Sequence, residues 1–410
     1  MNKKILSNSA WLFFAQGIVK VIAFFYTIFL ARSLGIDGFG FYVTALAYFS
    51  LISSFADFGF NRYLIREGAK NPDKLPDFIR STALTRLSTT TLLLIIFAFW
   101  LTFFDQNITR TNLSILAVLA VLPQAVSFTF DAALIARQNL RLSALSILGL
   151  SLTTTFTGVL LISKGYGVFG GVLALIFGQL VYMAILYFML SLARVPLFKG
   201  VSGESIKAVL KGSLPYGILG ILGLLYFRID TLMISYIKGV EQAGLYGAAY
   251  RFLEALIFIP SALATAMFPV LAKLHDNDIK RVKEMYFSAL KILGFLSLPI
   301  VLGYYLILPT VIQTLLPDYL PSIQAVLILA LAIPFIFLHV PGALVLISSE
   351  RFLKSVIILS VFTLSFNIIT NLIFIPSFGF IGAAYTTVAS EILSFVVFFI
   401  LLYQKVLKHA

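Results

Sequence analysis

Apolar stretches of about twenty residues follow one another along the whole chain, and this repetition limits what the chain can fold into. A helix of roughly 20 residues is long enough to cross the hydrocarbon core of a bilayer. One such stretch, 214–236, carries two charged residues, Arg228 and Asp230, in otherwise apolar sequence. A charge at this depth costs roughly 3 kcal/mol on insertion scales. Both side chains are therefore expected to face protein or water, and both are candidates for a functional site.

The composition supports the same interpretation. Hydrophobic residues make up 60% of the chain and charged residues only 11%, whereas about a quarter of the residues in a soluble domain are charged. The chain is therefore predicted to be an all-α, polytopic integral membrane protein. It has no cysteine, which excludes disulfides and thiolate metal sites. We expect no cofactor and no bound metal.

Twelve membrane-spanning helices are expected. The predicted spans are 9–31, 41–61, 82–104, 113–136, 142–163, 168–192, 214–236, 244–270, 286–308, 322–348, 354–376 and 379–403. The first span is too long for the apolar region of a signal peptide and lacks a clear small-residue cleavage site, so we expect it to be retained.

Lysine and arginine fall unevenly on the two sides of these spans. With a cytoplasmic N-terminus, 21 of the 30 Lys and Arg residues lie in cytoplasmic segments, and only four lie in outer ones: Arg32, Arg110, Lys164 and Lys238. Positive charge is enriched in cytoplasmic loops. The bias predicts a protein of the cytoplasmic membrane with both termini inside, and it explains the net charge of +13 without a nucleic acid partner.

Two short motifs occur twice. The segment 35–42 (GIDGFGFY) matches 239–246 (GVEQAGLY), and 167–171 with Gln179 matches 379–383 with Glu391. Gly35 and Gly239 suit the left-handed end of a helix. The repeats predict two six-helix lobes, 1–200 with helices 1–6 and 201–410 with helices 7–12. Because each half has an even number of spans, the lobes should be parallel pseudo-repeats around a central cavity that holds the substrate.

The order of several motifs resembles a known family. They are the N-terminal run to Leu30-Ala31-Arg32-Ser33-Leu34-Gly35, the Gly40-Phe41-Tyr42 turn, Arg228-Ile229-Asp230-Thr231-Leu232-Met233-Ile234, Gly244-Leu245-Tyr246-Gly247-Ala248-Ala249-Tyr250-Arg251, Pro269-Val270-Leu271, and Asn371, Pro376 and Gly379-Phe380-Ile381-Gly382-Ala383-Ala384. The pattern is similar to the polysaccharide-export flippases of the multidrug/oligosaccharidyl-lipid/polysaccharide superfamily, the Wzx-like group.

This resemblance implies a function. A polyprenyl-pyrophosphate-linked sugar would be moved from the cytoplasmic to the outer leaflet by alternating access, without ATP and without catalysis. A proton or sodium gradient would drive the movement, and a polysaccharide polymerase or ligase would be a partner.

A lipid carrying two phosphates needs fixed positive charge in a wet cavity. Lys20 lies at the centre of the first span and has no acid within four residues, so we expect it to line the cavity. Arg228 and Asp230 are about 200° apart around one helix. One of them should face the cavity, and the sequence leaves open which. Arg251 either binds substrate as well or pairs with Glu254 three residues on.

Other charged residues have simpler interpretations. Arg86 and Lys291 are expected to extend to the cytoplasmic surface. His339, between two prolines, is interpreted as a packed polar residue. Glu391, in the middle of the last span, is either an ion-coupling site for H⁺ or Na⁺ or a buried protonated acid.

Two other classes of protein remain as alternatives. A cation-coupled drug or metabolite antiporter of the same superfamily would require acids rather than bases at its centre. A membrane-embedded polymerase or ligase would require a large outer loop with polar catalytic groups, whereas the predicted outer loops are short. The sequence therefore favours a transporter that is not an enzyme.

Overall fold

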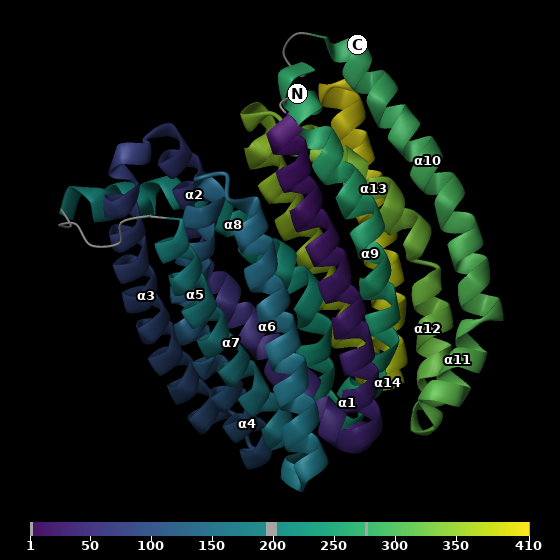
Figure 1. Cartoon of the computed structure of the whole chain (residues 1–410). Helices are drawn as coiled ribbons and strands as arrows, with labels where there is room; N and C mark the ends of the chain where they lie inside the picture. The colour runs from purple at the N-terminus through teal and green to yellow at the C-terminus, as the bar shows by residue number, and fades with distance from the viewer. Residues whose placement is uncertain (1–2, 194–202, 275–277, 410) are drawn as a thin grey trace. The chain divides into compact units, whose positions relative to one another are not determined.

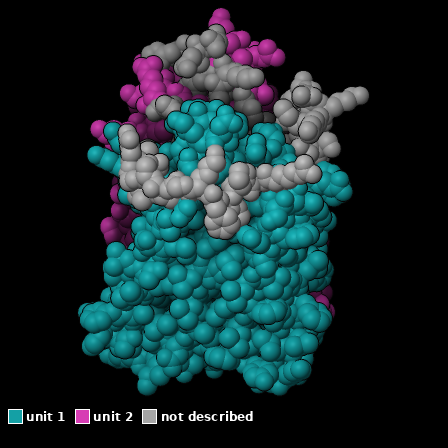
Figure 2. Space-filling view, turned by 60° about the vertical axis from the view of Figure 1, so that its left-hand side comes forward, with its two compact units in different colours: residues 1–228 teal, residues 229–410 magenta. Residues whose placement is uncertain are grey.

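The computed structural model describes residues 3–193, 203–274 and 278–409, and all the regular structure in these ranges is helical. The chain forms two compact units, unit 1 (Met1–Arg228) and unit 2 (Ile229–Ala410). Figure 2 colours these units separately. The division falls inside helix α8 (Gly203–Ile237).

Unit 1 contains seven long helices before α8, which Figure 1 labels in chain order. They are α1 (Lys3–Asp57), α2 (Phe60–Lys70), α3 (Leu75–Phe104), α4 (Ile108–Leu119), α5 (Val121–Ala136), α6 (Leu140–Leu161) and α7 (Gly167–Leu192), with short turns η1 (Pro72–Lys74) and η2 (Ile162–Tyr166).

Unit 2 begins within α8 and continues through six further helices. They are α9 (Val240–Leu274), α10 (Ile279–Leu306), α11 (Leu308–Leu315), α12 (Ser322–Ala330), α13 (Ile333–Ile347) and α14 (Leu353–Lys405), with short turns η3 (Pro317–Tyr319), η4 (Glu350–Phe352) and η5 (Leu407–His409).

The helices account for the expected number of membrane crossings. Within the described ranges, eight helical segments are long and apolar enough to cross a membrane, and the bent pair α12 and α13 forms a ninth span. Three of the eight are 53 to 57 residues long. Each of these three contains a glycine with positive φ near its middle, at Gly35, Gly167 or Gly379, and so crosses twice. The twelve-span, all-α membrane fold predicted from the sequence is confirmed.

The repeated glycines adopt matching backbone conformations. Gly167 has φ 51° and ψ −139°, and Gly379 has φ 59° and ψ −141°. Gly35 and Gly239, the first glycines of the other repeated motif, also have positive φ, 67° and 95°. A side chain with a Cβ atom is strained in this region. These glycines lie where one helix ends and the next begins, which the sequence had predicted for Gly35 and Gly239.

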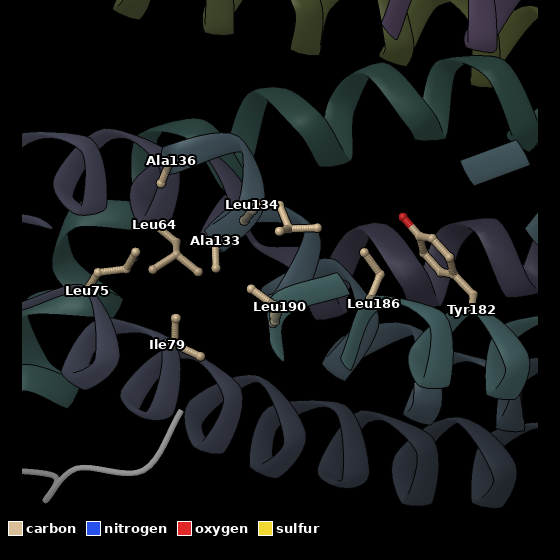
Figure 3. Packing of buried hydrophobic residues seen from close by; sticks show 10 residues of the cluster. Leu64, Leu75, Ile79, Ala133, Leu134, Ala136, Tyr182, Leu186 and Leu190 are labelled. Atoms are coloured by element: carbon tan, nitrogen blue, oxygen red, sulfur yellow. The ribbon is translucent and has the colours of Figure 1, made fainter. Parts of the chain in front are cut away.

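One end of unit 1 is held by a cluster of buried apolar side chains. On α7, Tyr182, Leu186 and Leu190 recur every four residues and share one face. Figure 3 shows this face packed with Leu64 of α2 and with residues of α3 and α5. The other members of the cluster are Leu75, Ile79, Ala132, Ala133, Leu134 and Ala136. Packing through this cluster joins α2, α3, α5 and α7.

Arg86 does not extend to the surface, so that prediction was wrong. Its side chain on α3 is only 1% exposed, and its guanidinium forms an ion pair with Asp57 at 2.5 Å. Helix α1 ends at Asp57, because the next two residues, Phe58 and Gly59, both have positive φ. The Asp57 carboxylate therefore lies at the end of α1, against Arg86 of α3. A buried arginine that is paired with a carboxylate does not need to extend to water.

Neutral groups complete the shell of Arg86. The guanidinium donates to Asn61 Oδ1 at 3.0 Å, to the Ala125 carbonyl at 3.2 Å and to Thr129 Oγ1 at 3.1 Å. It also lies 5.5 Å from the centroid of the Phe60 ring. These partners come from α2 and α5, so a single side chain of α3 ties together four helices of unit 1.

Candidate functional site

Two of the five predicted site residues lie in unit 1. Lys20 is exposed on α1, and no described carboxylate lies within ion-pair distance of it. Arg228 is half-buried and is the last residue of unit 1. Each side chain carries a positive charge that can bind an anion.

One hollow in the described surface of unit 1 is apolar. It has a volume of about 890 Å³ and lies against α6 and α7. Its lining includes Phe156, Leu160 and Phe177, with Thr153 and Thr157 as the polar members. A hollow of this chemistry suits hydrocarbon, and neither Lys20 nor Arg228 lines it.

In unit 2, Arg251 pairs with Glu254, which is one of the two interpretations that the sequence left open. Its guanidinium donates to Glu254 Oε2 at 2.8 Å, one turn further along α9. Both side chains are about a quarter exposed. Arg251 thus has an acidic partner, which a phosphate would have to displace.

Asp230 lies at the centre of a buried polar cluster in unit 2. It is 4% exposed. Its Oδ2 accepts hydrogen bonds from the hydroxyls of Tyr246 at 2.8 Å and Thr387 at 3.0 Å, and its Oδ1 accepts from the amide of Asn371 at 2.7 Å. A carboxylate buried in a membrane protein is costly unless such donors surround it.

The cluster extends to a second shell of polar groups. The Asn371 amide also donates to Asn367 Oδ1 at 3.1 Å, and the Asn367 amide donates to the Ser390 hydroxyl at 3.4 Å. The Thr387 hydroxyl also lies 3.0 Å from the Ala383 carbonyl. Asn371 Oδ1 is buried and has no hydrogen-bond partner in the described part of the chain.

The glycine break in α14 explains why these residues meet. Asn371 lies eight residues before Gly379, and Thr387 lies eight residues after it. When the chain reverses at Gly379, two residues at equal distance from the break come level with each other on the two halves of α14. Asn367 and Glu391 are likewise twelve residues before and after Gly379. Gln242 of α9 stabilises this break, because its side-chain oxygen accepts a hydrogen bond from the Phe380 backbone amide at 3.0 Å.

This arrangement can bind a small cation. It offers one carboxylate with several neutral oxygens, from Asn367, Asn371, Thr387 and the Ala383 carbonyl, and hard cations prefer such ligands. A single carboxylate balances the charge of a monovalent ion. In the described part of the chain, no three or more His, Asp and Glu side chains gather to hold a metal ion, so the cluster is less suited to a divalent or transition metal.

Glu391 has a different partner. It is 3% exposed, and its Oε2 lies 3.0 Å from Nδ1 of His339 on α13. The distance is that of an ion pair, but the two atoms are not aligned for a hydrogen bond. The His339 ring stacks on Phe398, with ring centroids 6.2 Å apart. His339 is therefore packed, as the sequence analysis expected, but it is packed against an acid.

Sequence reasoning missed most of the Asp230 cluster. Tyr246 and Asn371 entered only as parts of family-like motifs, and Asn367, Thr387 and Ser390 were not considered. The available signal was the spacing of polar residues in apolar sequence: Asn367 and Asn371 are four apart, and so are Thr387 and Glu391. Each pair therefore shares one helix face.

Comparison with known proteins identifies the family. The profile of the polysaccharide biosynthesis protein family matches residues 5–275, and the MatE profile matches residues 215–373. The chain is 24% identical to the probable flippase AglR of Haloferax volcanii over 172 residues, which is 40% of this chain and 35% of that protein. The chain thus aligns with only about a third of that relative.

Two further similarities extend over more of the chain. It is 24% identical to the putative O-antigen transporter of Shigella flexneri over 318 residues, or 73% of each chain. Its fold resembles a multidrug resistance MATE family transporter of the MOP superfamily in an inward-facing conformation, with a TM-score of 0.79, 15% identity and coverage of 95% and 94%. The superfamily resemblance drawn from the motifs is confirmed. Because the profile of the polysaccharide biosynthesis protein family matches well over half of the chain, the chain belongs to that family.

Proposed function

We propose that this multi-pass membrane protein is a flippase for a polyprenyl-pyrophosphate-linked oligosaccharide. It moves the sugar unit from the cytoplasmic to the outer leaflet of the cytoplasmic membrane by alternating access, for surface polysaccharide assembly. The family match over residues 5–275 carries this proposal, and the relatives named as a flippase and an O-antigen transporter support it. A polysaccharide polymerase or ligase is the proposed downstream partner.

In this function Lys20 and Arg228 bind the pyrophosphate. Lys20 is exposed and has no acidic partner among the described residues. Arg228 can bond two phosphate oxygens through its planar fork. Arg251 has a lesser role, since it is held by Glu254.

An ion gradient drives the cycle, and unit 2 provides the ion site. Asp230, assigned from the sequence to the substrate, is better suited to a cation, because its carboxylate is only 4% exposed and the side chains bonded to it, Asn371 and Thr387, also carry oxygens that can bind a cation. An anionic substrate would be repelled there. Glu391 remains the second ion-coupling residue.

The experiment neutralises the two bases separately. Lys20→Ala and Arg228→Ala should cause lipid-linked sugar to accumulate on the cytoplasmic leaflet. A charge-assisted contact is worth about 1.5–3 kcal/mol, or roughly 10- to 100-fold in binding. Arg228→Lys should keep part of the activity, since the charge survives while the fork is lost. Lys291→Ala, at an exposed base of another span, is the matched control.

The readout is leaflet-resolved lipid-linked sugar, together with the abundance of each variant in the membrane. Normal flipping in both alanine variants would refute the cationic site. Loss of the protein from the membrane would instead show that the bases are structural.

A cation-coupled drug or metabolite antiporter is the second candidate. The MatE match at residues 215–373 and the similar fold favour it. It predicts cation-driven efflux of an organic cation from vesicles that contain no lipid-linked sugar, whereas the flippase predicts none.

A further inference from the structure

The pair formed by Glu391 and His339 lies beside the Asp230 cluster and shares no hydrogen bond with Asp230. Both residues belong to unit 2, and Glu391 Oε2 lies 3.0 Å from His339 Nδ1. Glu391 is 3% exposed, whereas His339 is 20% exposed and so reaches the surface of the protein. A buried acid thus has an ionisable base as its neighbour in the middle of the last crossing.

The charges of the two groups are linked. A carboxylate that leaves water needs either a proton or a cationic partner. One proton shared by the pair makes it neutral overall, as imidazolium with carboxylate or as imidazole with carboxylic acid. Loss of that proton leaves a net negative charge in a buried place, and a second proton leaves a net positive one. The pair is therefore suited to hold one proton.

The other ionisable groups around the pair do not replace either partner. On α9, Arg251 and Glu254 pair with each other. On α10, Tyr286 approaches α13 at Gly342, one turn from His339, and Lys291 is exposed. Helix α12 carries no ionisable residue. The remaining neighbour is the Asp230 carboxylate of α8, with Tyr246 of α9 bonded to it.

The Asp230 cluster lies close enough to affect this proton. Thr387, which bonds Asp230, is one turn before Glu391 on α14, a separation of about 6 Å along the axis. Ser390, next to Glu391, accepts a hydrogen bond from Asn367 of the same cluster. Two unit charges about 6 Å apart, at an effective dielectric constant of about 20, change each other's binding by roughly a hundredfold.

We propose that His339 and Glu391 form a proton-binding site that is emptied when a monovalent cation occupies the Asp230 cluster. The cation adds one positive charge and the pair gives one proton to solvent through the partly exposed imidazole, so the total charge of unit 2 is unchanged. This inference rests on the proposed cation site at Asp230. It makes the proton-loaded and cation-loaded states of unit 2 mutually exclusive, as exchange of the two ions requires.

The test uses the purified full-length protein in detergent, with Na⁺ alone as the probe and no sugar substrate. NaCl, or choline chloride as the ionic-strength control, is added to weakly buffered protein with a pH-sensitive dye. Na⁺ should release about one proton per protein, because the pair holds one and linkage expels it. Thermal stability with and without Na⁺ reports cation binding independently.

The variants separate the two sites. Asp230→Asn should lose both the Na⁺-dependent stabilisation and the proton release. Glu391→Gln should keep the stabilisation and lose the release. His339→Phe keeps an aromatic ring beside Phe398 and should also lose the release, because the base that shares the proton with Glu391 is gone. Glu284→Gln, at an exposed acid of α10, should behave as the unmodified protein.

Two results would overturn the inference: Na⁺ stabilising the protein without releasing a proton, or equal release from Glu391→Gln. Absence of any Na⁺ effect would refute it together with the cation site. Because the assay contains no lipid-linked sugar, each outcome is independent of whether the flippase assay succeeds.

Discussion

The buried pair of Arg86 and Asp57 gives the sharpest prediction for stability. Asp57→Asn removes the carboxylate and leaves a guanidinium that is 1% exposed facing only neutral acceptors. Breaking a buried pair in this way costs about 3–5 kcal/mol. Because the Asp57 side chain is 27% exposed and water can partly replace it, we expect the lower end, about 3 kcal/mol. For a unit of this size, that lowers the midpoint of thermal unfolding by roughly 6–12 °C.

A double-mutant cycle tests whether the pair itself is the cause. Arg86→Met should also destabilise unit 1, but Asp57→Asn with Arg86→Met should cost about as much as one single change, because no unpartnered charge remains. The control is Glu67→Gln at the exposed Arg66–Glu67 pair of α2, which should cost less than about 1 kcal/mol. Thermal unfolding of the purified variants in detergent provides the measurement. Additive losses would refute the reasoning, since they would show that the two side chains act independently.

Two further predictions concern the fold. Gly379→Ala should destabilise unit 2 by about 1–2 kcal/mol, because φ is +59° there and the added methyl would displace Gln242 from the Phe380 amide. The control is Gly220→Ala, where nothing lies within 4 Å of the added methyl. It should be neutral or stabilising in the same thermal unfolding experiments. Reporter fusions after Lys74, Lys199 and Lys280 should be cytoplasmic, and fusions near Asp105, Lys164 and Asp318 external; one fusion on the wrong side would contradict the twelve-span topology.

The fold could be predicted because its signals are local. Apolar length sets each crossing, and glycines such as Gly35 and Gly379 mark where a crossing ends. Both signals act within a few residues along the chain. The repeated motifs then added the internal symmetry, since Gly167 and Gly379 needed the same unusual backbone conformation.

The site was only partly predictable because its contacts join distant segments. Asp57 and Arg86 are 29 residues apart, and Asp230 and Thr387 are 157 apart. For Arg86, position near the end of a span favoured a path to the surface, and nothing in the neighbouring sequence indicated a carboxylate from another helix. For Asp230, the cost of a buried charge correctly predicted a partner without identifying it. Burial of charge can be inferred from one segment, whereas the identity of the partner requires the packed helices.

Helix α8 gives the proposed function a physical link between its two ligands. Arg228, assigned to the phosphates, and Asp230, assigned to the cation, are two residues apart on one continuous helix. They are separated by about 3 Å along the axis and about 200° around it, so they cannot contact the same ligand. They also cannot move independently while that turn remains helical. A shift of Asp230 when a cation draws in Asn371 and Thr387 would therefore reorient Arg228 by a similar amount. In the function proposed above, cation binding at Asp230 would therefore also change the orientation of Arg228.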